Sequence, residues 1–251
     1  LNRLSYNSFL SHLRKLNLNI DASAKIVGPH LLHGSQWGII DPVDTPDGGN
    51  VGFHKHMSMM TKISEDIDER LIIKWIKKNM MTIHANILDK PKTLKTIDIT
   101  VAKKDELFNF FKIFVNGNLL FLTNIPDLFK KTFLQARRLN LIPPYISISF
   151  NIKDRYIHIY CDEGRLLRPL LYFSENTLNY LNQSEVYQKL IYNDFTWNQC
   201  INSFKKDSGP TSNNYINITP DIINNKENRK LRGIIEFLDK SEEDSALICM
   251  Y

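Results

Sequence analysis

The chain has 251 residues, of which 43% are hydrophobic and 24% charged, and this is ordinary for a globular protein of one or two domains. Its three cysteines lie far apart and form neither a disulfide framework nor a zinc-binding spacing, which predicts a reducing compartment. No apolar run approaches the length of a membrane span, no signal peptide opens the chain, and the net charge of +5 favours an anionic partner only weakly.

The first predicted element is a helix over residues 1–17, where apolar residues recur near the helical period and Ser5 or Ser8 can cap the start. Arg14 and Lys15 lie at its end, where cations suit the negative pole of the helix dipole. From residue types alone, both are interpreted as cap charges.

A polar loop is predicted over residues 17–27, with Lys25 as its only cation. A lone exposed lysine is usually solvated surface. A second loop lies between predicted strands that end near Ile40 and begin near Val51. Its prolines fix φ, its short acidic and hydroxyl side chains can bond to the backbone, and its glycines can take positive φ. Residue types alone therefore favour a rigid hairpin turn over a ligand-binding loop; its key residues are Pro42, Asp44, Thr45, Pro46, Asp47 and Gly48.

Four histidines flank this turn and could suggest a metal site: His30, His33, His54 and His56. His54 and His56 are alternate residues on one face of a predicted strand. No Cys or Glu at a fixed spacing completes a ligand set, so we predict no metal site and interpret the histidines as polar loop and strand residues. His33 is expected to hold the loop through a backbone bond. A metal hydrolase built on the four histidines stays open as an alternative.

In the middle of the chain, charge patterning predicts a helix over residues 64 to about 81, and residues 82–104 suggest short strands. Asn116-Gly117 between apolar runs predicts a hairpin, and Pro126 is expected to open a helix. The cations of that helix are assigned to its solvated face, with nucleic-acid contact as the alternative: Lys130, Lys131, Arg137 and Arg138.

Farther along, residues 145–150 and 156–161 predict two strands, and residues 205–228 predict a loose loop. Residues 233–248 predict a strand, an acidic turn and another strand. A solvated acidic loop is favoured there over a metal site, and its residues are Glu242, Glu243 and Asp244. The elements together predict an α+β fold, with mixed small helices and antiparallel strands in two or three subdomains.

Three ordered motifs resemble the fork region of the second-largest, β-like subunit of multisubunit DNA-directed RNA polymerases. That family has a Ser-His-x-Arg-Arg segment, a Leu-His-x-x-x-Trp/Tyr-Gly step and a Pro-x-Glu-Thr-Pro-Glu-Gly loop. The corresponding residues here are 11–15, 32–38 and 42–48, and Asn50 matches the bacterial form. The chain departs from the family pattern at four positions. Asp44 and Asp47 replace the two loop glutamates, Lys15 replaces an arginine, and His30 stands where arginine is usual.

The resemblance also implies a domain organisation. Residues 1–65 correspond to the fork, residues 66–175 to the external 1 region with a poor match over 82–104, and residues 176–251 to the start of external 2. Asp-x-Gly-Arg-x-x-Arg-Pro-Leu at 162–170 carries the external 1 likeness, and Arg165 and Arg168 are expected to be structural. Because the chain starts without Met inside a predicted helix, we expect a fragment of a longer protein.

The function implied by the resemblance is to position template and RNA near the active centre of a transcribing nucleotidyltransferase. No catalytic residue and no metal ligand is expected in this chain, because the Mg²⁺ of the complete enzyme would be bound outside it. Implied nucleic-acid-binding residues are Arg14, Lys15, Lys25, His30 and Asn50, and residues 42–48 would form an active-centre loop. Implied partners are the largest subunit, the other polymerase subunits, the DNA template and the nascent RNA. No association with a membrane is implied.

An alternative from another class is a stand-alone nucleic-acid-binding module. It would need a concentrated basic surface, yet residues 1–60 hold five Lys or Arg against four Asp. Near-neutrality favours insertion into a larger machine. The 25 asparagines suggest AT-rich coding, and hence a large DNA virus or a plasmid. An intracellular location is expected, with the cytoplasm (viral factory or virion) favoured over the nucleus.

Overall fold

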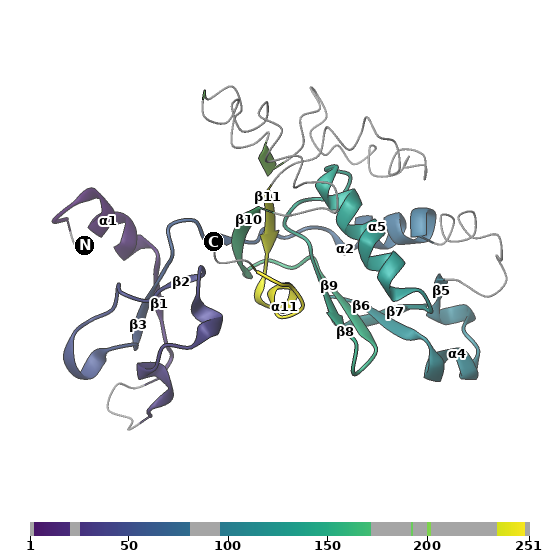
Figure 1. The fold of residues 1–251 in the computed structure, drawn as a ribbon, viewed down its shortest axis with the longest axis horizontal. Helices are drawn as coiled ribbons and strands as arrows, with labels where there is room; N and C mark the ends of the chain where they lie inside the picture. The colour runs from purple at the N-terminus through teal and green to yellow at the C-terminus, as the bar shows by residue number, and fades with distance from the viewer. Residues whose placement is uncertain are drawn as a thin grey trace. The chain divides into compact units, whose positions relative to one another are not determined.

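The computed structural model describes residues 3–20, 26–80, 96–171, 192, 200–201 and 235–248. The chain divides into two compact units, Leu1–Ile63 with Arg165–Pro169, and Ser64–Gly164 with Leu170–Tyr251 (Figure 1). Short helices and mostly antiparallel strands make up the described elements of both units. This confirms the predicted α+β class.

The first unit combines one short helix with a three-stranded antiparallel sheet. Helix α1 (Tyr6–Leu13) begins after Ser5, whose hydroxyl accepts the Ser8 amide at 3.2 Å. The sheet has the order β1-β3-β2, with bounds Lys15–Asn17, His54–Met57 and Ile40–Asp41. Helix α1 is shorter than predicted because Arg14 ends it and Lys15 already pairs with His56 in the sheet.

Short 3-10 turns and one further strand pair complete this unit. The turns span Gly28–His30, Gly34–Gln36 and Gly48–Asn50. Strand β4 (Lys62–Ile63) pairs antiparallel with the start of β10 (Leu166–Leu171). The buried apolar side chains described in this unit are few, namely Ile39, Phe53 and Leu167.

The second unit is built on a five-stranded sheet of order β5-β7-β6-β9-β8. The strand bounds are Thr96–Asp98 (β5), Phe111–Val115 (β6), Asn118–Thr123 (β7), Ser147–Asn151 (β8) and Tyr156–Tyr160 (β9). Helices α2 (Glu69–Trp75) and α5 (Pro126–Arg138) share one apolar core with this sheet. Trp75 of α2 meets Phe133 of α5 edge to face, with ring centroids 5.7 Å apart. The remaining described elements are the π-helical turn Ile76–Met80, the 3-10 turn Ile99–Val101, α4 (Lys104–Asn109), β11 (Ile235–Leu238) and α11 (Lys240–Glu243).

Several predicted elements of this unit are confirmed. Asn116 and Gly117 join β6 to β7 with φ angles of 46° and 83°, as a hairpin turn with two positive φ angles requires. Pro126 is the first residue of α5. Strands β8 and β9 pair antiparallel across the turn after Asn151.

The helix predicted from residue 64 begins later, at Glu69. Residues 64–68 are not helical, and the Ser64 hydroxyl donates to the Asp162 carbonyl at 2.9 Å. Asp68 caps α2 instead, and its side chain accepts the Arg70 amide at 2.9 Å. Of the strands predicted over 82–104, residues 81–95 lie outside the described residues; β5 is present, and α4 begins at Lys104 where no helix was expected. The loose loop predicted over 205–228 also lies outside them.

The prediction that Arg137 and Arg138 lie on a solvated helix face is wrong. Arg137 is 2% exposed, and its guanidinium donates to both carboxylate oxygens of Glu242, at 2.8 and 2.7 Å, and to the Ile146 carbonyl at 2.8 Å. Arg138 donates to Glu236 at 2.6 Å. Burial opposes the charge on Arg137, but the neighbouring carboxylates outweigh it and raise the pKa of Arg137.

The prediction of a solvated acidic loop at residues 242–244 is wrong for Glu242, although Asp244 is exposed. Glu242 is 3% exposed and belongs to α11, whose first turn is capped by Asp239. Its carboxylate also accepts the Ile148 amide at 3.2 Å. No strand follows α11 within the described residues up to 248. These contacts tie α11 to α5 by an ion pair and to β8 by a hydrogen bond, both shielded from water.

We expect the substitution Arg137→Met to lower the free energy of unfolding by about 3–5 kcal/mol, because Glu242 is then buried without its cation. Urea unfolding of the chain measures the change. Lys131→Met, at an exposed position of the same helix, is the matched control and should change stability by less than about 0.5 kcal/mol. Equal effects of the two substitutions would contradict the importance of the buried pairs.

The environment of His158 is expected to make the free energy of unfolding depend on pH. Its ring stacks on Phe114 and Tyr160, with centroids 5.0 and 5.9 Å away, and partial burial lowers the pKa of His158. The unfolded chain then binds more protons, so this contribution is complete above the ordinary histidine pKa of about 6.5 and is lost as pH falls from there through the lower pKa of the folded state. We expect His158→Phe, which keeps an aromatic ring, to reduce the loss of unfolding free energy between about pH 7.5 and about pH 5. An unchanged pH profile in urea unfolding would contradict this.

Candidate functional site

The loop at residues 42–48, called here the 42–48 loop, is held by side chain to backbone hydrogen bonds. Asp41 accepts the amides of Val43 and Asp44, at 2.9 and 3.3 Å. The Thr45 hydroxyl donates to the His54 carbonyl at 3.0 Å and accepts the Gly52 amide at 2.8 Å. The loop has no helix or strand of its own between β2 and the 3-10 turn Gly48–Asn50, so these bonds fix its path.

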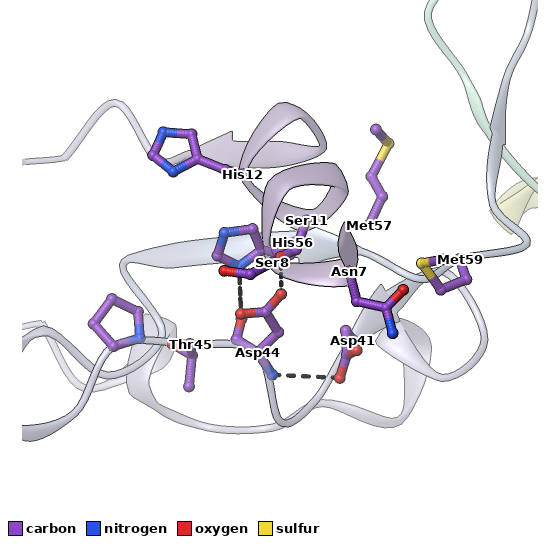
Figure 2. Close-up of a pocket in the computed structure, with 11 residues that line it drawn as sticks. Asn7, Ser8, Ser11, His12, Asp41, Asp44, Thr45, His56, Met57 and Met59 are labelled. Carbon is purple, nitrogen blue, oxygen red and sulfur yellow. Dashed lines mark hydrogen bonds and ion pairs between the residues drawn. The ribbon is translucent and has the colours of Figure 1, made fainter. Parts of the chain in front are cut away.

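Asp44 ties the loop to two other elements (Figure 2). The Ser11 hydroxyl of α1 donates to one carboxylate oxygen. His56 of β3 donates from Nδ1 to the Asp44 carbonyl at 2.8 Å, and the same nitrogen lies 3.4 Å from the other carboxylate oxygen. The Asp44 side chain remains 42% exposed. The carboxylate is thus held in place by α1 and β3 while staying accessible.

Arg14, which ends α1, is engaged with backbone oxygens. One terminal nitrogen donates to the carbonyls of Ser58 and Thr61, at 2.7 Å each. Its Nε is buried and has no hydrogen-bond partner within the described chain. The side chain therefore positions the segment after β3, and its predicted contact with nucleic acid stays a prediction.

The histidines around the loop bond individually to different partners. His30 donates from Nδ1 to the Val51 carbonyl at 2.7 Å, and its ring meets Phe53 edge to face. His33 accepts the Ser35 amide at 3.2 Å and so caps the 3-10 turn Gly34–Gln36, while its expected hold on the loop stays a prediction. His54 lies 3.2 Å from the Asn17 side-chain oxygen. In the part of the chain that the structure describes, no three His, Cys, Asp or Glu side chains are grouped to hold a metal ion.

The remaining predicted site residues differ in exposure. Lys15 is half-buried in β1, whereas Pro42, Asp47, Gly48 and Asn50 are exposed. Lys25 lies outside the described residues. The structure brings Asp44, Thr45 and Pro46 together with α1 around one hollow, and His30 bonds to the residue that follows Asn50.

Three residues with structural roles at the site were missed from the sequence. Ser11 and His56 hold Asp44, as described above.

The third role belongs to Gly38, which has φ +75°, and an added Cβ there would lie 2.6 Å from the Arg168 guanidinium. Arg168 donates to the Trp37 carbonyl at 3.0 Å, which agrees with the structural role expected for it. Ser11 and Gly38 lie within the quoted family motifs, which was a usable signal; nothing in the sequence pairs His56 with Asp44.

A hollow of about 590 Å³ opens beside the 42–48 loop (Figure 2). Its walls come from α1, from Asp41 and residues 44–46, and from the end of β3 together with Met59. No helix in the described ranges is both long and apolar enough to cross a membrane.

Comparison with known proteins agrees with the motif order. The family model described as RNA polymerase Rpb2, domain 3, matches residues 1–63, and that described as RNA polymerase Rpb2, domain 4, matches residues 113–174. The first match contains α1, the 42–48 loop and β3, and the second runs from within β6 through α5 to β10.

Among similar proteins is the DNA-directed RNA polymerase II subunit RPB2 of Meyerozyma guilliermondii, 28% identical over 100% of this chain and 18% of its own length. Another is the DNA-directed RNA polymerase III subunit 2 of Arabidopsis thaliana, 25% identical over 100% of this chain and 18% of its own length. The polymerase III subunit RPC2 of Drosophila melanogaster is 31% identical over 67% of this chain and 14% of its own length. The chain thus spans less than a fifth of the relatives it matches. It belongs to the family of second-largest subunits of multisubunit DNA-directed RNA polymerases.

Gly52 gives a test of the loop's anchoring. Its φ is +83°, and an added Cβ would lie 1.9 Å from the Pro29 carbonyl oxygen. We expect Gly52→Ala to destabilise this unit by more than about 1 kcal/mol, measured as faster amide exchange over residues 48–57. Gly49→Ala is the matched control, since nothing lies within 4 Å of its added Cβ. Comparable exchange in both variants would contradict the anchoring.

Proposed function

We propose that this chain works as part of the second-largest subunit of a DNA-dependent RNA polymerase, where it positions template and RNA near the active centre during transcription. The observation that carries the proposal is the 42–48 loop, fixed by Ser11 and His56 through Asp44. This loop lies within residues 1–63, which match the second-subunit domain 3. A rigid loop of this kind suits a scaffold against which mobile nucleic acid is aligned.

The exposed apolar surface of the first unit supports a place inside a larger assembly. Tyr6 and Leu13 of α1 are 76% and 60% exposed, and Trp37 is 51% exposed. Exposed apolar residues in such numbers are typical of surfaces that another protein covers. A stand-alone nucleic-acid-binding module, the alternative, would instead present a concentrated basic surface.

In this proposal, the acidic side chains of the loop do not contact phosphate. Asp44 and a phosphate would repel each other, and Asp44 already accepts the Ser11 hydroxyl. Contacts to nucleic acid are assigned to Arg14, Lys15, Lys25, His30 and Asn50. His30 can use only Nε2, because Nδ1 is bonded to Val51.

The chemistry of the complete enzyme is assigned outside this chain. We propose that nucleotidyl transfer uses Mg²⁺ held by other residues of the polymerase, and that the largest subunit, further subunits, DNA and nascent RNA are the partners. Cys161 and Cys200 are buried and form no disulfide, in keeping with a reducing, intracellular site of action. A viral or plasmid source stays a prediction from the asparagine-rich composition.

Lys15 provides a test in a polymerase assembled with this chain. Lys15→Gln removes the charge and keeps most of the stem, so we expect the salt dependence of elongation-complex stability to fall by about one phosphate contact. The measurement is the half-life of stalled complexes over a series of salt concentrations. Lys104→Gln, at an exposed position of α4 in the other unit, is the control. An assembled polymerase with identical salt slopes for both variants would refute the Lys15 contact.

A further inference from the structure

The hollow beside the 42–48 loop has a lining rich in hydrogen-bond acceptors. Asp41 and Asp44 contribute carboxylates, and Asn7 and Ser11 of α1 contribute an amide and a hydroxyl (Figure 2). Met57 and Met59 contribute flexible thioether side chains, and Met59 is 60% exposed. No Lys or Arg lines it within the described chain.

The charges around the hollow are unbalanced. Asp44 is approached by the Ser11 hydroxyl and by His56, which carries a charge only when protonated. Asp41 accepts two backbone amides, which are neutral donors. His12 is the other titratable side chain on the wall. Two carboxylates therefore face the space, and within the described residues neither has a Lys or Arg in an ion pair with it.

This lining selects among classes of ligand. An anion such as phosphate would be repelled by the two carboxylates. A divalent metal ion needs a set of oxygen ligands, and no such group is formed by the described residues. A guanidinium or ammonium group supplies donors only, which match the acceptors present. Its aliphatic stem would pack on Met57 and Met59, since methionine adapts to irregular apolar contacts.

We propose that this hollow receives an arginine or lysine side chain carried by a segment of a neighbouring polypeptide. At about 590 Å³ the hollow has room for such a side chain together with part of the segment that bears it. The partner is a protein and not a nucleic acid, because a nucleic-acid backbone would bring phosphates toward Asp41 and Asp44. The proposal rests on the proposed function, which supplies the assembly that contains the neighbouring polypeptide.

A photo-cross-linking residue placed at Met59 tests the proposal in the assembled polymerase. The photo-cross-linking residue is p-benzoylphenylalanine, and the cross-linked peptides are to be identified by mass spectrometry. Met60 is the matched control position, because it is 56% exposed and does not line the hollow. We expect cross-linking from Met59 to one segment of another polypeptide that contains Arg or Lys. Cross-links to nucleic acid, or the same products from both positions, would overturn the proposal.

The acidic residues are tested in the same assembly with the double substitution Asp41→Asn and Asp44→Asn. Asparagine can still accept the bonds from Ser11 and the loop amides, so the fold is retained while both charges are removed. We expect about tenfold less cross-linking from Met59 and no change from Met60. Amide exchange over residues 41–57 reports directly whether the loop is intact. With an intact loop, an unchanged Met59 yield overturns the proposal.

Failure of the inference and failure of the proposed function give different results. If the chain does not enter an active polymerase, the proposed function fails before any cross-link is measured. If the polymerase assembles and transcribes while Met59 gives no protein cross-link, only the inference fails.

Discussion

The arrangement of the first unit depends on the contacts that fix Asp44 in place. The Ser11 hydroxyl reaches it from α1, and His56 reaches it from β3. Asp44 thereby connects Ser11, which lies 33 residues before it, with His56, which lies 12 residues after it. Because the 42–48 loop has no ladder of its own, loss of this hold would leave only Asp41 and Thr45 to define its path. A polar contact thus takes the place that apolar packing holds in most loops.

Sparse apolar burial explains why polar contacts matter so much here. The apolar residues buried in the described part of this unit are Ile39, Phe53 and Leu167, whereas the second unit has a continuous core from α2, α5 and its sheet. Arg14 compensates by bonding to two carbonyls after β3, and hydrogen bonds to a charged group contribute about 1.5–3 kcal/mol each.

Local patterns in the sequence predicted the elements whose signals are local. Asn116-Gly117 specifies its hairpin because few other residues accept two positive φ angles, and Pro126 specifies the start of α5. The predictions failed where a partner lies far along the chain. Arg137 pairs with Glu242 across 105 residues, and Glu242 also accepts the Ile148 amide across 94 residues. Helical periodicity placed Arg137 opposite the apolar side, but periodicity cannot reveal that an acidic segment returns to cover that side.

The sequence predicted which residues belong to the candidate site, but it did not predict the hydrogen bonds between them. Motif order located the 42–48 loop and Ser11, yet the sequence does not say that Ser11 meets Asp44 or that one nitrogen of Arg14 is engaged by two carbonyls. The aspartates that replace the family glutamates now have a physical reading. This reading concerns Asp44, whose carboxylate contacts Ser11 of α1 and His56 of β3 at one wall of the hollow. The charge at that wall then acts on whatever enters the hollow, which makes a cationic side chain the best-matched neighbour of this loop.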